Sequence, residues 1–154
     1  MGRIQDRLRE LAITLPAAAK PVANYVPWVR TGNLVFVSGQ IPVLDGRPCQ
    51  TGQLGAGVDV DQGAAAARIC ALNILAQIND ACAGDLDKVA QVVKLVGFVS
   101  AAPHFIDIPK VVNGASDLMV EIFGQAGKHA RSAVGVSSLP LGVSVEVEAV
   151  VELR

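Results

Sequence analysis

The 154-residue sequence has few aromatic residues, no cluster of like charge and no long apolar run. Aromatic side chains make up only 4% of the chain, so stacking platforms for nucleotide bases are scarce. Lys and Arg number 13 against 14 Asp and Glu, which argues against a nucleic-acid partner, because such proteins gain affinity from clustered cations. No stretch reaches the roughly 18 apolar residues that indicate a membrane span, so no membrane partner is expected.

The cysteines and histidines do not form the patterns of a metal site. Cys49, Cys70 and Cys82 lack the paired short spacing of zinc ligands, and there are only two histidines. Residues 1–15 mix charged and apolar side chains and contain no secretion signal, so we expect a reducing, cytoplasmic setting without metal or cofactor. Cys70 and Cys82 should be buried, whereas Cys49 is the one thiol worth testing for reactivity.

The residues that are present suit one domain with an aliphatic core. Hydrophobic residues make up 51% of the chain, and its length suffices for one core but not for two ordinary domains. Ile4, Leu8 and Leu11 recur at helical spacing before Pro16, which predicts a helix followed by a linker over residues 1–24. Residues 25–154 are expected to form the main domain.

The hydrophobic periodicity of this domain predicts the element order ββαβαββ. Strands are expected at 25–29 and 34–38, a long turn segment at 41–57, helices at 60–83 and 109–123, and further strands at 89–100, 132–139 and 143–153. The strand at 89–100 is apolar at nearly every position, which suits coverage on both faces. The buried stripe of the first long helix is expected at Ile69, Leu72, Leu75, Ala76 and Ile78.

The last strand predicts a sheet with two unlike faces. Its valines alternate with Ser144, Glu146, Glu148 and Glu152, so one face is apolar and the other partly acidic. With two helices against one face, an α+β sandwich is the natural architecture. The other face then requires either water or another subunit.

Five separated motifs carry a resemblance to a known family. They are Tyr25-Val26, the segment FVSGQIP at 36–42, Asn113, the segment ARSAVGV at 130–136 with Leu139-Pro140, and the ending VEVEA at 145–149. In this order and spacing they resemble the RidA/YjgF family from Tyr25 to the C-terminus. The resemblance implies a chorismate-mutase-like fold, a homotrimer whose sheets line a central β-barrel, and sites in clefts between subunits.

The resemblance also implies a reaction and its residues. The reaction is hydrolytic deamination of reactive 2-imino or enamine acids, such as 2-iminobutanoate and 2-iminopropanoate, to 2-keto acids and ammonia. By motif, Arg131 binds the substrate carboxylate and Glu146 handles the attacking water. The residues implied to line the same cleft are Tyr25, Ser38, Gly39, Asn113 and the backbone at Ala133.

Two positions depart from the family pattern, and other interpretations stay open. Ala133 stands where many relatives carry Cys, and His129 where many carry Pro. Arg131 alone could be a surface arginine, Glu146 part of a solvated strand face, and Tyr25 a packing residue at a subunit boundary. Alternative functions are a non-catalytic, ligand-binding regulatory trimer and, ranked last, an endoribonuclease or translation inhibitor.

Overall fold

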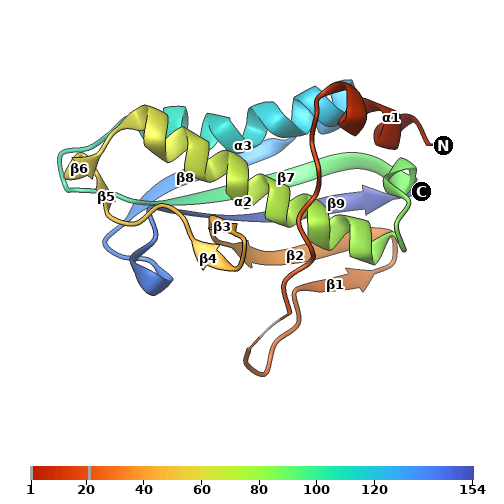
Figure 1. The fold of residues 1–154 in the computed structure, drawn as a ribbon, viewed down its shortest axis with the longest axis horizontal. Helices are drawn as coiled ribbons and strands as arrows, with labels where there is room; N and C mark the ends of the chain where they lie inside the picture. The colour runs from red at the N-terminus through yellow and green to blue at the C-terminus, as the bar shows by residue number, and fades with distance from the viewer. Residues whose placement is uncertain (1, 21) are drawn as a thin grey trace.

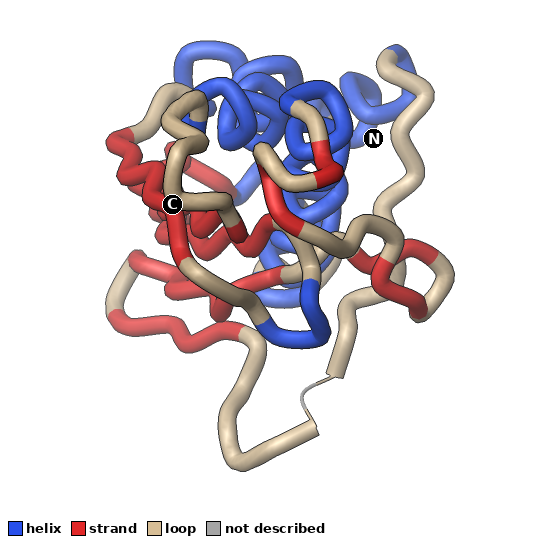
Figure 2. Tube along the Cα trace, turned by 90° about the vertical axis from the view of Figure 1, so that its left-hand side faces the viewer, coloured by secondary structure: helices blue, strands red, loops and turns tan. Residues whose placement is uncertain are grey.

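A five-stranded sheet dominates the computed structural model, which describes residues 2–20 and 22–154. In spatial order its strands are β1 (Trp28–Thr31), β2 (Leu34–Gln40), β9 (Val145–Leu153), β7 (Val89–Ser100) and β8 (Ala130–Val136). Neighbouring strands are antiparallel except for β7 and β8, which are parallel. The helices α2 (Val60–Ala81) and α3 (Ile108–Phe123) lie together on one side of this sheet (Figures 1 and 2). The predicted α+β class and ββαβαββ order are therefore confirmed.

The two long helices pack closely on each other and on the sheet. α2 begins with a capping box, in which Asp59 and Gln62 exchange hydrogen bonds. The expected stripe of α2 is wrong at Ile69, which is only half-buried, whereas Leu72 is half-buried but packs against the core. Its buried residues include many small ones, because α2 contacts both α3 and the sheet, and small side chains fit that space: Gly63, Ala66, Ala67, Cys70, Ala71, Ile74, Leu75, Ala76, Gln77 and Ile78.

Strand boundaries differ from the prediction where proline interrupts the ladder. β1 begins at Trp28 rather than at residue 25, because Pro27 has no N–H and contributes only its carbonyl, which accepts from Ser38 N at 2.8 Å. The turn segment at 41–57 contains two small ladders of two-residue strands: β3 (Val43–Leu44) with β4 (Arg47–Pro48), and β5 (Gln53–Leu54) with β6 (Gly57–Val58). Short 3₁₀ turns η1 (Leu86–Lys88), η2 (Gly124–Gly127) and η3 (Pro140–Gly142) complete the chain.

The sheet has one covered face and one open face, the open face being the side away from α2 and α3. Val145, Val147 and Val151 of β9 are buried under the helices, while Glu146 is half-buried and Glu148 exposed on the other side. Within the chain β7 is covered on one face only, contrary to expectation, since Lys94 is exposed. Apolar side chains also lie on the open face, and Phe36 is 46% and Val134 43% exposed. The open face is therefore neither fully polar nor covered.

The N-terminal segment is attached to the helical layer. α1 (Arg3–Glu10) buries Ile4 and Leu8 in the same core as the rest of the chain, and Arg7 Nε donates to the Glu121 carbonyl of α3 at 2.8 Å. Residues 13–20 form an extended segment, called the arm, that crosses α2 (Figure 1). Gln77 Nε2 of α2 donates to Ala19 O of the arm at 2.9 Å. None of the helices in the described residues has the length and apolar character needed to cross a membrane.

Candidate functional site

A bulge in β2 positions the first group of predicted site residues. Val37 pairs with Ala149 and Gln40 with Val147, so Ser38 and Gly39 together lie opposite Glu148 alone. Such two-against-one bulges bend a strand and re-aim its side chains, and they are common beside active sites. Ser38 Oγ donates to the Val26 carbonyl at 2.8 Å, which ties the bulge to the loop that carries Tyr25.

The carboxylate of Glu146 lies directly against this bulge. Gly39 leaves the space that Glu146 occupies, because a Cβ added at residue 39 would collide with Glu146 Oε1 and lie 2.9 Å from its Cδ. The pKa of Glu146 is raised, first because partial burial disfavours its charged form and second because Glu148 is close. A carboxyl group whose pKa is raised toward neutrality suits general acid and base chemistry.

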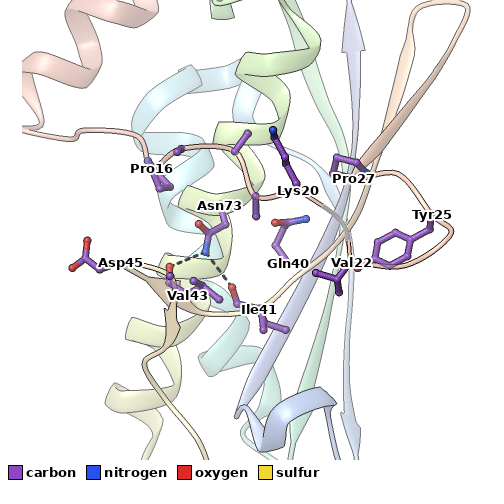
Figure 3. A pocket seen from close by; sticks show the side chains of 15 residues that line it. Pro16, Lys20, Val22, Tyr25, Pro27, Gln40, Ile41, Val43, Asp45 and Asn73 are labelled. Atoms are coloured by element: carbon purple, nitrogen blue, oxygen red, sulfur yellow. Dashed lines mark hydrogen bonds between the residues drawn. The ribbon is translucent and has the colours of Figure 1, made fainter.

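A cavity of about 660 Å³ adjoins the bulge (Figure 3). One wall is formed by residues 16–20 of the arm and by Val22, and the opposite wall includes Gly39, Gln40 and Ile41. Asn73 of α2 donates to the carbonyls of Ile41 and Val43, both at 3.1 Å, and so fixes the second wall. Tyr25 lies at the rim and is 56% exposed. The structure thus groups Tyr25, Ser38, Gly39 and Glu146; we call these four residues the bulge half-site.

Arg131 and Asn113 form a second group at the edge of the sheet. Arg131 Nη1 donates to Asn113 Oδ1 at 2.8 Å and to Ser116 Oγ at 3.2 Å, both on α3. Among the described residues, no protein acceptor engages Nε or Nη2 of this guanidinium. Ala133, two residues further along β8, packs on the core. We call Asn113, Ser116, Arg131 and Ala133 the arginine half-site.

The two half-sites lie on opposite faces of the sheet within one chain. Arg131 pairs with buried Leu95 and reaches the helices, whereas Glu146 pairs with Phe98 and projects from the open face. The predicted site residues therefore form two groups rather than one. A single copy of the chain cannot place one small molecule between Arg131 and Glu146.

Two residues of the arginine half-site region were not predicted from the sequence. His129 Nε2 lies 2.9 Å from Ser116 Oγ, and His129 Nδ1 lies 2.7 Å from the Gly127 carbonyl. The spacing indicates that both residues lie near predicted site residues. Residues 129 and 131 alternate as on one strand face, and residues 113 and 116 share one helix face. His104, by contrast, is exposed.

The remaining candidate groups contribute less chemistry. No cluster of three or more His, Cys, Asp or Glu side chains suited to a metal occurs within residues 2–20 and 22–154. Cys70 and Cys82 are buried, as predicted, and Cys49 is exposed. Partial desolvation raises the pKa of Cys49, which lowers its thiolate fraction and hence its reactivity.

Comparisons with known proteins agree with the fold and with the family resemblance. The chain is 52% identical over 154 residues to Protein TCP17 of Trypanosoma cruzi, covering 99% of this chain and 96% of that protein. It is 33% identical to a 2-iminobutanoate/2-iminopropanoate deaminase of Dermatophagoides farinae, over 92% of this chain and 95% of that protein. A crystal structure of Atu1372 from Agrobacterium tumefaciens, a protein of unknown function, matches with a TM-score of 0.92 and 49% identity, over 98% of this chain and 92% of that one.

A family profile covers almost the entire chain. Residues 5–153 match the family described as "YjgF/chorismate_mutase-like, putative endoribonuclease", including most of the N-terminal helix. The match spans both half-sites and the whole sheet. The chain therefore belongs to the RidA/YjgF family and has its chorismate-mutase-like fold.

Proposed function

We propose that this protein hydrolyses reactive 2-imino acids to 2-keto acids and ammonia, in a site completed by two copies of the chain. The observation that carries the proposal is the hydrogen bonding of the Arg131 guanidinium group. Its Nη1 is held by Asn113 and Ser116, which leaves the edge formed by Nε and Nη2 available for a ligand. That edge presents two parallel N–H donors at the spacing of the two oxygens of a carboxylate.

The substrate carboxylate would dock on this edge of Arg131. Hydrogen bonds to charged groups contribute about 1.5–3 kcal/mol each, and a bidentate pair also fixes the orientation of the acid. A fixed carboxylate places the adjacent imine carbon at one defined point. Orientation of this kind can account for much of the rate of a hydrolytic step.

Glu146 would supply the proton transfers. It removes a proton from water as the water oxygen bonds to the imine carbon, the C=N electron pair moves to nitrogen, and Glu146 passes this proton to that nitrogen. The resulting carbinolamine then collapses: Glu146 takes the hydroxyl proton as the C=O bond forms, and it gives this proton to the nitrogen as the C–N bond breaks and ammonia departs. The raised pKa of Glu146 supports this double role, because a base must also be able to act as an acid in the second half of the reaction.

Assembly would bring the two half-sites together. Since Arg131 and Glu146 lie on opposite faces of one sheet, the glutamate of one copy must meet the arginine of another. Apolar residues on the open face, including Phe36 and Val134, support its burial between copies. A closed homotrimer, as the family resemblance implies, would bury three such faces around one axis.

The cavity beside Gly39 would receive the side chain of the acid. Its walls are mainly apolar, from Pro16 and residues 17–19 on one side and Ile41 and Val43 on the other. A volume of about 660 Å³ exceeds what an ethyl group needs. The proposed substrates therefore extend beyond 2-iminobutanoate to 2-imino acids with longer side chains.

Ammonia release from 2-iminobutanoate, generated in place by an amino acid oxidase, tests the activity. Arg131→Ala should lower kcat/KM by about 150-fold or more, because two charge-assisted hydrogen bonds are lost. Arg131→Lys keeps the charge but not the fork, and should recover only part of this loss. Wild-type protein that does not accelerate ammonia release would refute the proposal.

A mixing experiment tests whether the site is shared. Arg131→Ala and Glu146→Gln proteins should each be inactive, whereas a mixture that is unfolded and refolded together should regain activity. If subunits assort randomly, about one site in four receives an intact arginine from one copy and an intact glutamate from its neighbour. Recovery near a quarter of the wild-type activity supports the shared site, and no recovery from correctly assembled mixtures contradicts it.

A ligand-binding protein without turnover is the second candidate, and the presence of Ala133 in place of the common cysteine is the observation that favours it. Calorimetric binding of 2-oxobutanoate that Arg131→Ala abolishes, together with no imine hydrolysis, would establish this alternative.

A further inference from the structure

Behind Arg131 lies a chain of hydrogen bonds that ends at a backbone carbonyl. The Gly127 carbonyl oxygen is 2.7 Å from His129 Nδ1, His129 Nε2 is 2.9 Å from Ser116 Oγ, and Ser116 Oγ is 3.2 Å from Arg131 Nη1. Gly127 ends η2, Ser116 lies on α3, Arg131 lies at the start of β8, and His129 lies in the short connection between η2 and β8. Arg131 is therefore linked through two side chains to a fixed point of the backbone.

The chemistry of these groups fixes the direction of each hydrogen bond. A carbonyl oxygen can only accept, so His129 Nδ1 must carry a hydrogen. In the neutral ring Nε2 then has a lone pair and accepts the hydroxyl hydrogen of Ser116. The lone pairs of Ser116 Oγ are consequently directed to its remaining neighbour, the donor Nη1 of Arg131.

We propose that Ser116 and His129 are positioning residues that aim the free edge of Arg131 at the substrate carboxylate. This inference rests on the proposed function of the same site. Asn113 alone would leave the guanidinium free to turn about a single hydrogen bond. The second acceptor, Ser116, engages the other hydrogen of Nη1 and so sets the plane of the group, which determines where Nε and Nη2 point.

His129 makes Ser116 an effective acceptor for this purpose. Without His129, the hydroxyl can rotate toward water or toward a carbonyl of its own helix, and its lone pairs are no longer held toward Arg131. The same pattern explains why a histidine is useful at a position where many relatives carry proline, since proline has no side-chain nitrogen to accept this hydrogen. The pinned guanidinium loses less rotamer freedom when the ligand arrives, which lowers KM.

The tautomer of His129 tests the arrangement independently of any activity. In ¹⁵N-labelled protein, two-bond N–H couplings should show His129 protonated at Nδ1 and bare at Nε2. Exposed His104 serves as the internal reference for an imidazole without this contact. Ser116→Ala should leave the Nδ1 hydrogen in place, because Gly127 still accepts it. A ring protonated at Nε2 alone would overturn the proposal.

Kinetics of matched variants test the positioning role itself. Ser116→Ala and His129→Leu should each raise KM for 2-iminobutanoate about tenfold while kcat stays within about twofold. Ser116→Thr keeps the hydroxyl and should restore the wild-type KM. In an Arg131→Ala background, Ser116→Ala should have no further effect.

The outcomes separate this inference from the proposed function. Normal wild-type activity with unchanged KM in both variants overturns the positioning role only. Wild-type protein that neither hydrolyses the imine nor binds 2-oxobutanoate counts against the proposed function, and with it against any role of Ser116 in carboxylate recognition. Covalent labelling of Ser116 by a fluorophosphonate would also overturn the positioning role, because it would show that the hydroxyl is a nucleophile.

Discussion

Replacing Gly39 by alanine should remove activity while leaving the fold intact. An added Cβ would collide with Glu146 Oε1, and it would lie 2.9 Å from Cδ and 3.2 Å from Cγ of the same side chain. Carbon atoms in contact are ordinarily about 3.5–4.0 Å apart, so the whole carboxylate must move by roughly 1 Å. A displacement of this size at a catalytic group costs about 100-fold in rate.

The effect on stability should be small, for two reasons. The atoms in the way belong to the end of a flexible, half-buried side chain that can rotate toward solvent. The φ angle of Gly39 is not positive, so alanine fits the backbone. Gly→Ala at a compatible position changes stability by about 0.4–1 kcal/mol in the favourable direction, which corresponds to roughly 1–4 °C in Tm at this chain length.

The assay compares kcat for ammonia release with Tm from calorimetry, in Gly39→Ala and in the Gly39→Ala/Glu146→Gln double variant. The double variant should be no slower than Glu146→Gln alone, because both changes act on one carboxylate. A Gly39→Ala enzyme that keeps kcat within about threefold of wild type would refute the reasoning. A fall in Tm large enough to unfold the variant under the assay conditions would also refute it, because unfolding would then explain the loss of rate.

Three further predictions concern stability. Because folding raises the pKa of the Glu146 carboxyl group, ionisation of this group destabilises the folded state as the pH rises through that pKa. Glu146→Gln removes this cost, so it should raise Tm at pH 7 and have no effect near pH 3 in melts of the monomeric protein. Gly114→Ala would drive a methyl group into the Ala64 carbonyl of α2 and should cost about 1–3 kcal/mol in urea unfolding by separating α2 from α3. Leu8→Ala should cost about 2–4 kcal/mol in the same measurement, unless α1 is only loosely attached.

Most of the fold could be predicted from the sequence, because the patterns that indicate helices and strands lie within short segments of the chain. Alternating valines around Glu146 predicted the two faces of β9, and hydrophobic periodicity predicted α2 and α3. The errors arose where contacts override periodicity. Ile69 is large and apolar yet only half-buried, because small residues fill the space where α2 meets α3.

The candidate site was predicted residue by residue, but its arrangement was not. Motifs named Arg131 and Glu146 without indicating that they face opposite sides of the sheet, since the alternation of β8 is masked by small residues around Ala133. The contact between Ser116 and His129 depends on how α3 docks beside β8. Spacing can place Ser116 beside Asn113 and His129 beside Arg131, but it does not indicate that these two pairs meet.

The strand order has a consequence for how the chain folds during synthesis. β9 lies between β2 and β7, although it is translated after both. Until the ribosome has released residues 145–153, the β1–β2 hairpin and the β7–β8 half therefore remain unjoined, each with an unpaired edge. Premature termination within β9 should leave two unjoined parts of the sheet, each with an unpaired strand edge that promotes aggregation. Such nascent chains should depend on chaperones for their solubility.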